Sequence, residues 1–313
     1  MLFPVSGVEV SALVPPLVAF AVSFVTSMGG VSGAFLLLPF QMSVLGFTTP
    51  AVSATNQVYN IVAIPGGVLR FIREGRMVWP LTLIVVAGTL PGVLVGALVR
   101  VRYLPDPARF KLFAGAVLLY VGGRLAFDLI RARGGEAASA EEQFHRLVSA
   151  GGTGDGADAG RLARVTAARL GLRRTAFEFY GQRFEIPTLG VLLLSLAVGA
   201  VAGVYGIGGG AILAPFFVAF FGLPVYTVAG AALAGTFVTS IAGVGFYHAI
   251  APFYPHLAVA PDWPLGLLFG LGGMVGIYLG ARCQKHVPAK GIKWMLVVVI
   301  VAVAASYLRP LLG

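Results

Sequence analysis

The stretch VYGIGGGAILAP, residues 204–215, places a cluster of glycines between two apolar segments. A related stretch, MGGVSGAFLLLP, occupies residues 28–39, and in both a glycine precedes a proline by six residues. Glycine adopts positive φ without steric cost, so such a cluster can end one helix and let another begin in a new direction. The two stretches therefore predict two helices that are broken within apolar surroundings.

The composition around these stretches is that of a membrane protein. Of 313 residues, 58% are hydrophobic and 11% are charged, whereas a soluble domain carries about 25% charged residues. Apolar runs near the roughly 20 residues needed to cross a bilayer cover residues 11–28, 80–99, 108–130, 187–204, 224–247, 263–281 and 292–308. A more polar candidate covers 50–72. We expect an all-α polytopic membrane protein.

The sequence offers little for catalysis or metal binding. The single cysteine, Cys283, excludes an internal disulfide and cysteine-rich metal sites. No H-E-x-x-H motif, clustered carboxylates or Cys/His set occurs, so we expect no enzyme, no metal and no cofactor. The N-terminus has no basic region ahead of its first apolar run, so no cleaved signal peptide is expected.

The net charge of +10 does not point to nucleic acid. Nine of the 22 Lys and Arg residues lie in 131–185, beside seven of the 12 acidic residues. The remaining basic residues flank apolar runs: Arg70, Arg73, Arg76, Arg100, Arg102, Arg109, Lys111, Arg282, Lys285, Lys290 and Lys293. That pattern is typical of topology signals and of charges at lipid headgroups.

The glycine motifs belong to a wider internal repeat. An offset of 176 residues aligns Gly30 with Gly206, Gly33 with Gly209, Pro39 with Pro215 and Gly46 with Gly222. An offset of 184 aligns the G-x-x-x-G motif at Gly92 with the one at Gly276, which we interpret as helix-packing contacts. The chain then divides into a membrane repeat at 1–133, a polar linker at 134–186 and a second membrane repeat at 187–313.

The linker has several parts. Residues 134–160 are polar and glycine-rich, as in a flexible linker. Residues 161–174 are basic and weakly amphipathic, which fits either a helix on the membrane surface or an ordinary solvated segment. Residues 177–185 alternate like a short strand.

The topology depends on the short apolar segments 34–46 and 211–222. If they cross the membrane, each half has five crossings (four full spans plus one short broken helix) and the repeats are inverted. If they are re-entrant, each half has four spans and the halves are parallel. Taking the basic linker as cytoplasmic, the positive-inside rule favours the inverted arrangement. We expect a multi-pass protein of the inner (plasma) membrane.

A helix that begins inside the membrane predicts an anion site. Its first N–H groups lack intrahelical partners and must face protein or a water-filled cavity. Together with the positive end of the helix dipole they attract anions, and matching broken helices in two repeats indicate a transporter's binding site. Close helix packing is the alternative role for glycine. The candidate residues are Gly30, Ser32, Gly33, Gly206, Gly208, Gly209 and Gly210.

Polar side chains on neighbouring segments extend this site. The stretch SATNQVYN, residues 53–60, places Asn56 or Gln57 and Asn60 at helical spacing, and such a polar stripe faces the interior of a bundle. The second half offers Thr236, which aligns with Asn60, and Thr239. These groups either contact the substrate or hydrogen-bond between helices. Weaker candidates are Gln41, Ser53 and Ser240.

GIGGGAILAPFF, with GGVSGAFLLLPF one repeat earlier, resembles the TauE/SafE family of sulfite and organosulfonate exporters. The resemblance implies export of small sulfur-containing anions, sulfite or organosulfonates, from the cytoplasm. The first copy departs from the pattern, with Ser32 and Ala34 where the second has Gly208 and Gly210. An anion channel or a facilitator for another small organic anion is the alternative, and the lipid bilayer, with a homodimer as one assembly, completes the expected partners.

Overall fold

The structure is a computed structural model of the whole chain. It describes residues 1–29, 32–75, 77–131, 168–171, 173–179, 182–209, 212–221, 223, 225–283 and 289–309.

The predicted apolar runs are all helices. The helices before the linker are α1 Val14–Gly29, α2 Ala34–Ser43, α3 Ala51–Ala63, α4 Pro65–Arg73, α5 Trp79–Arg102 and α6 Pro107–Arg131. Those after it are α9 Thr188–Tyr205, α10 Leu213–Phe221, α11 Val225–Ile250, α12 Trp263–Cys283 and α13 Ala289–Leu308, with a 3₁₀ turn at Ala251–Phe253. The more polar run at 50–72 is two helices, because Pro65 starts α4 directly after Ile64.

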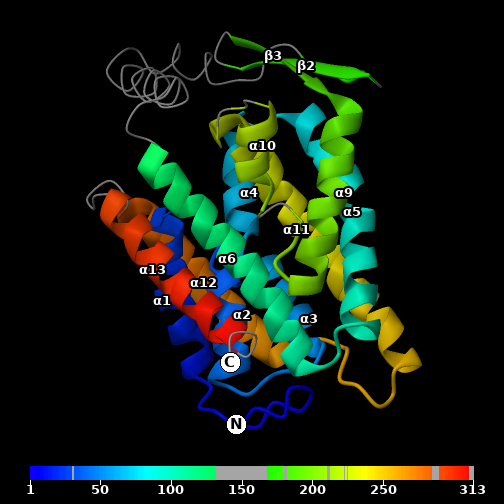
Figure 1. Cartoon of the computed structure of the whole chain (residues 1–313), viewed down its shortest axis with the longest axis vertical. Coiled ribbons are helices and arrows are strands. Elements are labelled where there is room, and N and C mark those ends of the chain that lie inside the picture. Colours follow the sequence, from blue (N-terminus) through cyan, green and yellow to red (C-terminus); the bar gives the residue numbers. More distant parts are fainter. Residues whose placement is uncertain are drawn as a thin grey trace.

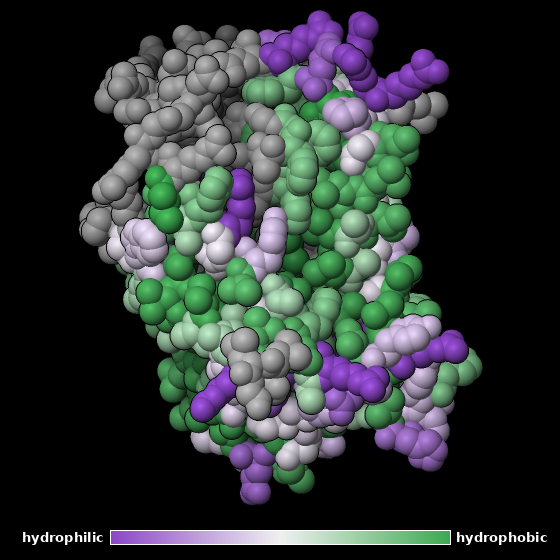
Figure 2. Space-filling view, viewed as in Figure 1, coloured by the Kyte–Doolittle hydropathy of each residue, from purple (hydrophilic) through white to green (hydrophobic). Residues whose placement is uncertain are grey.

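Six of the described helices are long and apolar enough to cross a membrane, and α1 and α2 are shorter apolar helices. Figure 2 shows a mostly hydrophobic surface across the middle of one face, with hydrophilic side chains gathered toward its two ends. Exposed side chains such as Leu83, Leu119 and Leu193 belong to this surface. The protein is therefore a polytopic helical membrane protein.

The helices pack mainly across the linker rather than within one half. The closest pairs are α1 with α12, α5 with α9, and α6 with α13, while α3 packs on α12 and α11 packs on α5. In Figure 1 the N-terminus and the end of α13 lie at the lower end of the molecule, and α9 begins at the upper end. The short helix α2 lies toward the lower end and α10 toward the upper end.

Glycine ladders hold the two closest pairs together. On α5, Cβ atoms built at Gly88, Gly92 and Gly96 would lie against the carbonyl oxygens of Leu192, Leu196 and Ala200 of α9. On α12, Cβ atoms at Gly272, Gly276 and Gly280 would lie against those of Pro16, Phe20 and Phe24 of α1. The packing role predicted for the two G-x-x-x-G motifs is confirmed.

A small antiparallel sheet precedes α9. It contains β1 Ala168–Arg169, β2 Arg174–Phe179 and β3 Gln182–Pro187 in the order β1-β2-β3. Phe177 lies opposite Phe184, with the ring centroids 5.5 Å apart, and such cross-strand aromatic pairs stabilise a hairpin. The strand predicted at 177–185 is confirmed as this hairpin. The alternative of a surface helix is wrong for residues 168–174, and residues 161–167 lie outside the described part.

Arg100 corrects one prediction from the charge pattern. The sequence assigned it to the headgroup region, but its side chain is fully buried. Its guanidinium group donates to the carbonyl oxygens of Thr48 (3.2 Å) and Leu104 and lies 3.7 Å from the centroid of the Phe110 ring. A guanidinium group is weakly hydrated and stacks on aromatic faces, so it can be buried where carbonyl acceptors are available.

Asp262, directly before α12, is a fully buried carboxylate. Its Oδ1 accepts from the backbone N–H of Leu265 at 3.2 Å, as an N-cap does. Its Oδ2 accepts from the N–H of Ser6 at 3.0 Å and from the Ser6 hydroxyl at 2.9 Å. The N-terminal segment is thereby tied to the start of α12.

Candidate functional site

The break after α9 is built by left-handed glycines. Gly206 caps the helix with φ of 85° and ψ of 25°, and its N–H donates to the carbonyl oxygen of Ala202 at 2.8 Å. Gly208 has φ of 76°. A Cβ atom at Gly206 would also lie 2.6 Å from Cα of Ser53 on α3. The predicted use of positive φ is confirmed at this break, where both conformation and space require glycine.

The same break lies against hydroxyl groups of α11 and α5. A Cβ atom at Gly208 would lie 2.7 Å from Cγ2 of Thr236 and 2.9 Å from Oγ of Ser240. The N–H of Gly209 donates to Oγ1 of Thr239 at 3.0 Å. A Cβ atom at Gly209 would lie 2.5 Å from Cβ of Thr89. The chain can pass between the two helices only with glycine at these positions.

The break before α2 uses glycine differently. Gly33 has φ of −59° and ψ of −28°, an ordinary right-handed conformation. A Cβ atom there would lie 2.6 Å from the hydroxyl oxygen of Tyr59 and 2.8 Å from Oγ of Ser23. Those two hydroxyls are hydrogen-bonded to each other at 2.9 Å. At Gly33 the requirement for glycine is therefore space.

The N–H groups at the start of α2 correct a second prediction. The sequence predicted several unpartnered N–H groups, but the first four of α2 have acceptors. Ser32 Oγ accepts from Ala34 N–H at 3.3 Å, and the Ser32 carbonyl from Phe35 N–H at 3.3 Å. The Gly33 carbonyl accepts the next two, at 3.1 and 3.0 Å. The prediction is wrong for these groups because a serine hydroxyl and a tight first turn satisfy them.

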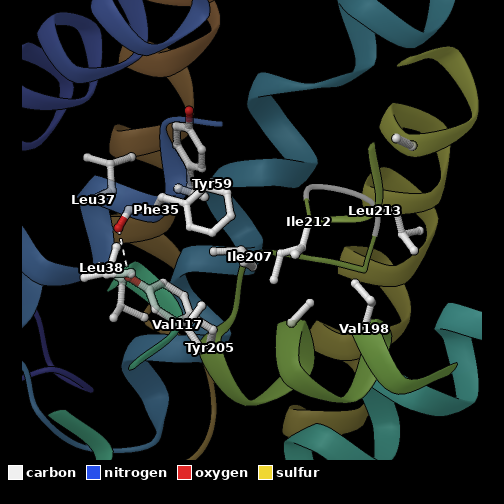
Figure 3. Packing of buried hydrophobic residues seen from close by; sticks show 14 of the residues in the cluster. Phe35, Leu37, Leu38, Tyr59, Val117, Val198, Tyr205, Ile207, Ile212 and Leu213 are labelled. Carbon is white, nitrogen blue, oxygen red and sulfur yellow. Dashed lines mark hydrogen bonds between the residues drawn. The ribbon is translucent and has the colours of Figure 1, made fainter. Parts of the chain in front are cut away.

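Asn56 joins the two breaks. Its Nδ2 donates at 3.1 Å to the carbonyl oxygen of Ala34, at the start of α2, and at 3.1 Å to that of Gly206, at the end of α9. Tyr205 adds a second link, since its hydroxyl donates to the carbonyl oxygen of Phe35 at 2.9 Å. Figure 3 shows Phe35 and Tyr205 packed closely, with Ile207 and Ile212 of the second break beside them. Segments about 170 residues apart therefore meet in the buried interior.

The polar stripes predicted on the two halves also meet. Asn60 of α3 donates from Nδ2 to Oγ of Ser240 on α11 at 3.2 Å, and Ser240 is the hydroxyl that lies against Gly208. Thr236 and Thr239 donate back to carbonyl oxygens of their own helix, those of Ala232 and Gly235. Thr239 keeps its oxygen as the acceptor for Gly209.

Several buried amide atoms beside the breaks have no hydrogen-bond partner among the described residues: Gln41 Oε1, Gln57 Oε1, Gln57 Nε2 and Asn60 Oδ1. The three side chains are fully buried. Gln41 also donates from Nε2 to Oδ1 of Asn56 at 3.4 Å, and Gln57 lies against Gly243 of α11. An unpartnered buried polar atom is costly and calls for an explanation.

The chemistry available here is that of uncharged hydrogen-bonding groups. The side chains that the structure places against the described parts of the breaks are Ser23, Gln41, Ser53, Asn56, Tyr59, Thr89, Thr236, Thr239 and Ser240. Among the described residues no group of three His, Cys, Asp or Glu side chains could hold a metal ion. Such a set can bind and orient a small solute.

Two of the predicted site residues, Gly30 and Gly210, lie outside the described residues. The sequence did not single out Tyr59, Tyr205, Ser23 or Thr89. Tyr59 lies within the SATNQVYN stretch and Tyr205 directly precedes Gly206, so their positions were the available signal. Aromatic residues are common in apolar helices, and only the fold places these hydroxyls at the breaks.

The family model described as Sulfite exporter TauE/SafE matches residues 16–307. No curated protein and no solved structure matches the chain.

Proposed function

Since the chain belongs to the TauE/SafE sulfite exporter family, which consists of membrane transporters and not of enzymes, we propose that it exports small sulfur-containing anions, sulfite or sulfonates, from the cytoplasm. The anion binds at the paired helix breaks, near the middle of the bilayer.

The observation that carries this proposal is the meeting of the two breaks beside unpartnered amides. Asn56 holds both breaks through their carbonyl oxygens, and buried polar atoms of Gln41, Gln57 and Asn60 lie close by without partners. Broken helices of this kind carry the substrate sites of many secondary transporters. The proposed site comprises Ser32, Gly33, Asn56, Gln57, Asn60, Gly206, Gly208, Gly209, Thr236 and Thr239, together with Gly30 and Gly210.

The helix pairing supports inverted repeats of five segments each. If α1 corresponds to α9 and α5 to α12, exchanging the halves turns the pair α1–α12 into α9–α5, and both pairs occur. The glycine ladders follow the same offsets, 184 residues for the glycines and 176 for their partners. The opposite placement of α2 and α10 in Figure 1 fits this arrangement. The repeats are then residues 1–133 and 187–313, joined by the linker 134–186 on the cytoplasmic side of the inner membrane.

The packing between the breaks favours a transporter over a permanently open channel. Phe35, Ile207 and Ile212 are buried apolar side chains at the junction, so a solute passes only after they separate. Movement of one repeat against the other around a fixed site is the usual way to achieve this.

The test is flux of sulfite and methanesulfonate in proteoliposomes, comparing the wild type with Gln57→Met. Removing two unpartnered polar atoms from the interior leaves the stability unchanged or raises it, yet we expect saturable flux to fall at least about tenfold, as for a lost substrate hydrogen bond. Thr82→Val is the matched control, because the Thr82 hydroxyl is buried on α5 and bonds only to Val78 and Met77.

The proposal fails if the folded wild type carries neither anion. It also fails for this site if Gln57→Met retains full flux and affinity. Flux that rises linearly with concentration and shows no competition between the two anions would indicate a channel.

A further inference from the structure

We infer that the site selects anions by charge: it accepts a single negative charge and rejects two. Its substrates are then bisulfite and monosulfonates, whereas the sulfite and sulfate dianions are excluded. This inference rests on the proposed function and concerns the same site.

The positive field at the breaks comes from two helix termini. The helices α2 and α10 both begin at the junction, α2 at Ala34 and α10 at Leu213. Each helix N-terminus is equivalent to about half a positive charge, so two of them balance about one negative charge. This field persists although the first N–H groups of α2 are hydrogen-bonded within the turn, because the dipole belongs to the whole helix.

Uncharged side chains complete the site. The unpartnered amide atoms of Gln41, Gln57 and Asn60 are fully buried. Two are connected to the breaks: Gln41 through Asn56, and Asn60 through Ser240, which lies against Gly208. A side-chain amide can turn to present either N–H or oxygen. It can therefore donate to the sulfonate oxygens and accept from the proton of bisulfite, but it supplies no net charge.

Basic side chains that could balance a second charge have other partners. The Arg100 guanidinium group is held by the Thr48 and Leu104 carbonyl oxygens and the Phe110 ring. Arg70, at the end of α4, pairs with Glu74 at 2.7 Å. The titratable side chains that the described residues place at the breaks are the phenols of Tyr59 and Tyr205.

A second negative charge would be buried without compensation. The junction is closed by Phe35, Ile207 and Ile212, and charges that leave water for such surroundings need a partner charge. Binding of the dianion is therefore weakened by far more than one missing hydrogen bond. Size does not produce this selection, because methanesulfonate and sulfate are both compact and tetrahedral.

The experiment compares methanesulfonate and sulfate as competitors of methanesulfonate flux in proteoliposomes, at a pH where each has a fixed charge. We expect sulfate to compete at least about tenfold more weakly, since a field of this size changes affinity by about that factor. In parallel, sulfite flux at constant total sulfite should fall as rising pH converts bisulfite to the dianion, while methanesulfonate flux stays level and thereby controls for titration of the protein.

A variant reverses the expectation. Gln57→Lys adds one positive charge at a buried, unpartnered position, and we expect the ratio of sulfate to methanesulfonate affinity to rise at least about tenfold. Gln57→Met is the uncharged control and should leave that ratio unchanged, whatever its effect on flux.

The outcomes separate this inference from the function on which it rests. If neither sulfite nor methanesulfonate is transported, the proposed function fails. If both are transported while sulfate competes as well as methanesulfonate, or sulfite flux rises with pH, the function stands and the charge selection is wrong. If Gln57→Lys does not fold, the competition and pH series in the wild type decide.

Discussion

At the break after α9 the backbone requires glycine, since Gly206 and Gly208 have positive φ, whereas at the break before α2 Gly33 is right-handed and only its surroundings leave no room for a side chain. Equivalent positions in the two halves therefore carry the same residue for different physical reasons. Matching glycines in a repeat do not imply matching conformations.

The one conspicuous departure between the motifs follows from this difference. Ser32 aligns with Gly208 at the offset of 176 residues. The first break needs a hydroxyl there to accept the N–H of Ala34, while the second needs a residue that tolerates φ of 76°. A serine at 208 would be strained, and a glycine at 32 would leave an N–H group without its acceptor.

The largest expected effect is at the second break. Gly206→Ala costs about 1–2 kcal/mol for the left-handed conformation, and its Cβ also overlaps the backbone of Ser53, which cannot move aside cheaply. We expect almost no folded protein by size-exclusion chromatography after extraction. Thr82→Val is the control. Normal yield and thermal stability for Gly206→Ala would contradict the conformational requirement.

The next effect concerns the link between the breaks. Asn56→Asp removes the Nδ2 donors of two carbonyl oxygens and places an acceptor against them, so we expect a loss of about 3 kcal/mol in stability. Thermal unfolding in detergent measures it. The adjacent Gln57→Met is the matched control, because it removes an amide without described partners. Equal melting temperatures for the two variants would mean that Asn56 does not hold the breaks together.

A smaller effect, with rescue, is expected at the first break. Gly33→Ala meets only the hydroxyls of Tyr59 and Ser23 at under 3 Å. Removing both hydroxyls in Ser23→Ala/Tyr59→Phe is nearly neutral in itself, since the two pair with each other. We expect the triple variant to recover most of the melting temperature lost by Gly33→Ala.

The corresponding attempt at the second break should fail, because Ser53 presents backbone rather than side-chain atoms to Gly206. Rescue of Gly206→Ala by Ser53→Ala, or no rescue of Gly33→Ala, would remove the distinction between the breaks.

The smallest effect is at Gly209. Thr239→Val removes the acceptor of the Gly209 N–H, which costs about 1–3 kcal/mol if that group stays buried without a partner. Thr236→Val is the matched control, because its hydroxyl bonds only within α11. Equal thermal stability of the two variants would show that water or another group replaces the Thr239 oxygen.

The sequence determined the membrane class, every long helix, the short helices and the glycine contacts between helices, because hydrophobic runs and small residues act locally along one helix. It also identified Asn60 and the hydroxyls of α11 as inward-facing. Arg100 was misassigned because the acceptors that permit its burial, on Thr48 and Leu104, belong to loops whose positions no local pattern gives.

Only the tertiary structure decided that the two breaks meet, that Asn56 uses its amide to join them and that Tyr59 and Tyr205 lie there. These facts depend on pairing α1 with α12 and α5 with α9, segments separated by most of the chain. Periodicity tells which face of a helix is buried, but the partner of that face is chosen by the packing of all the helices together.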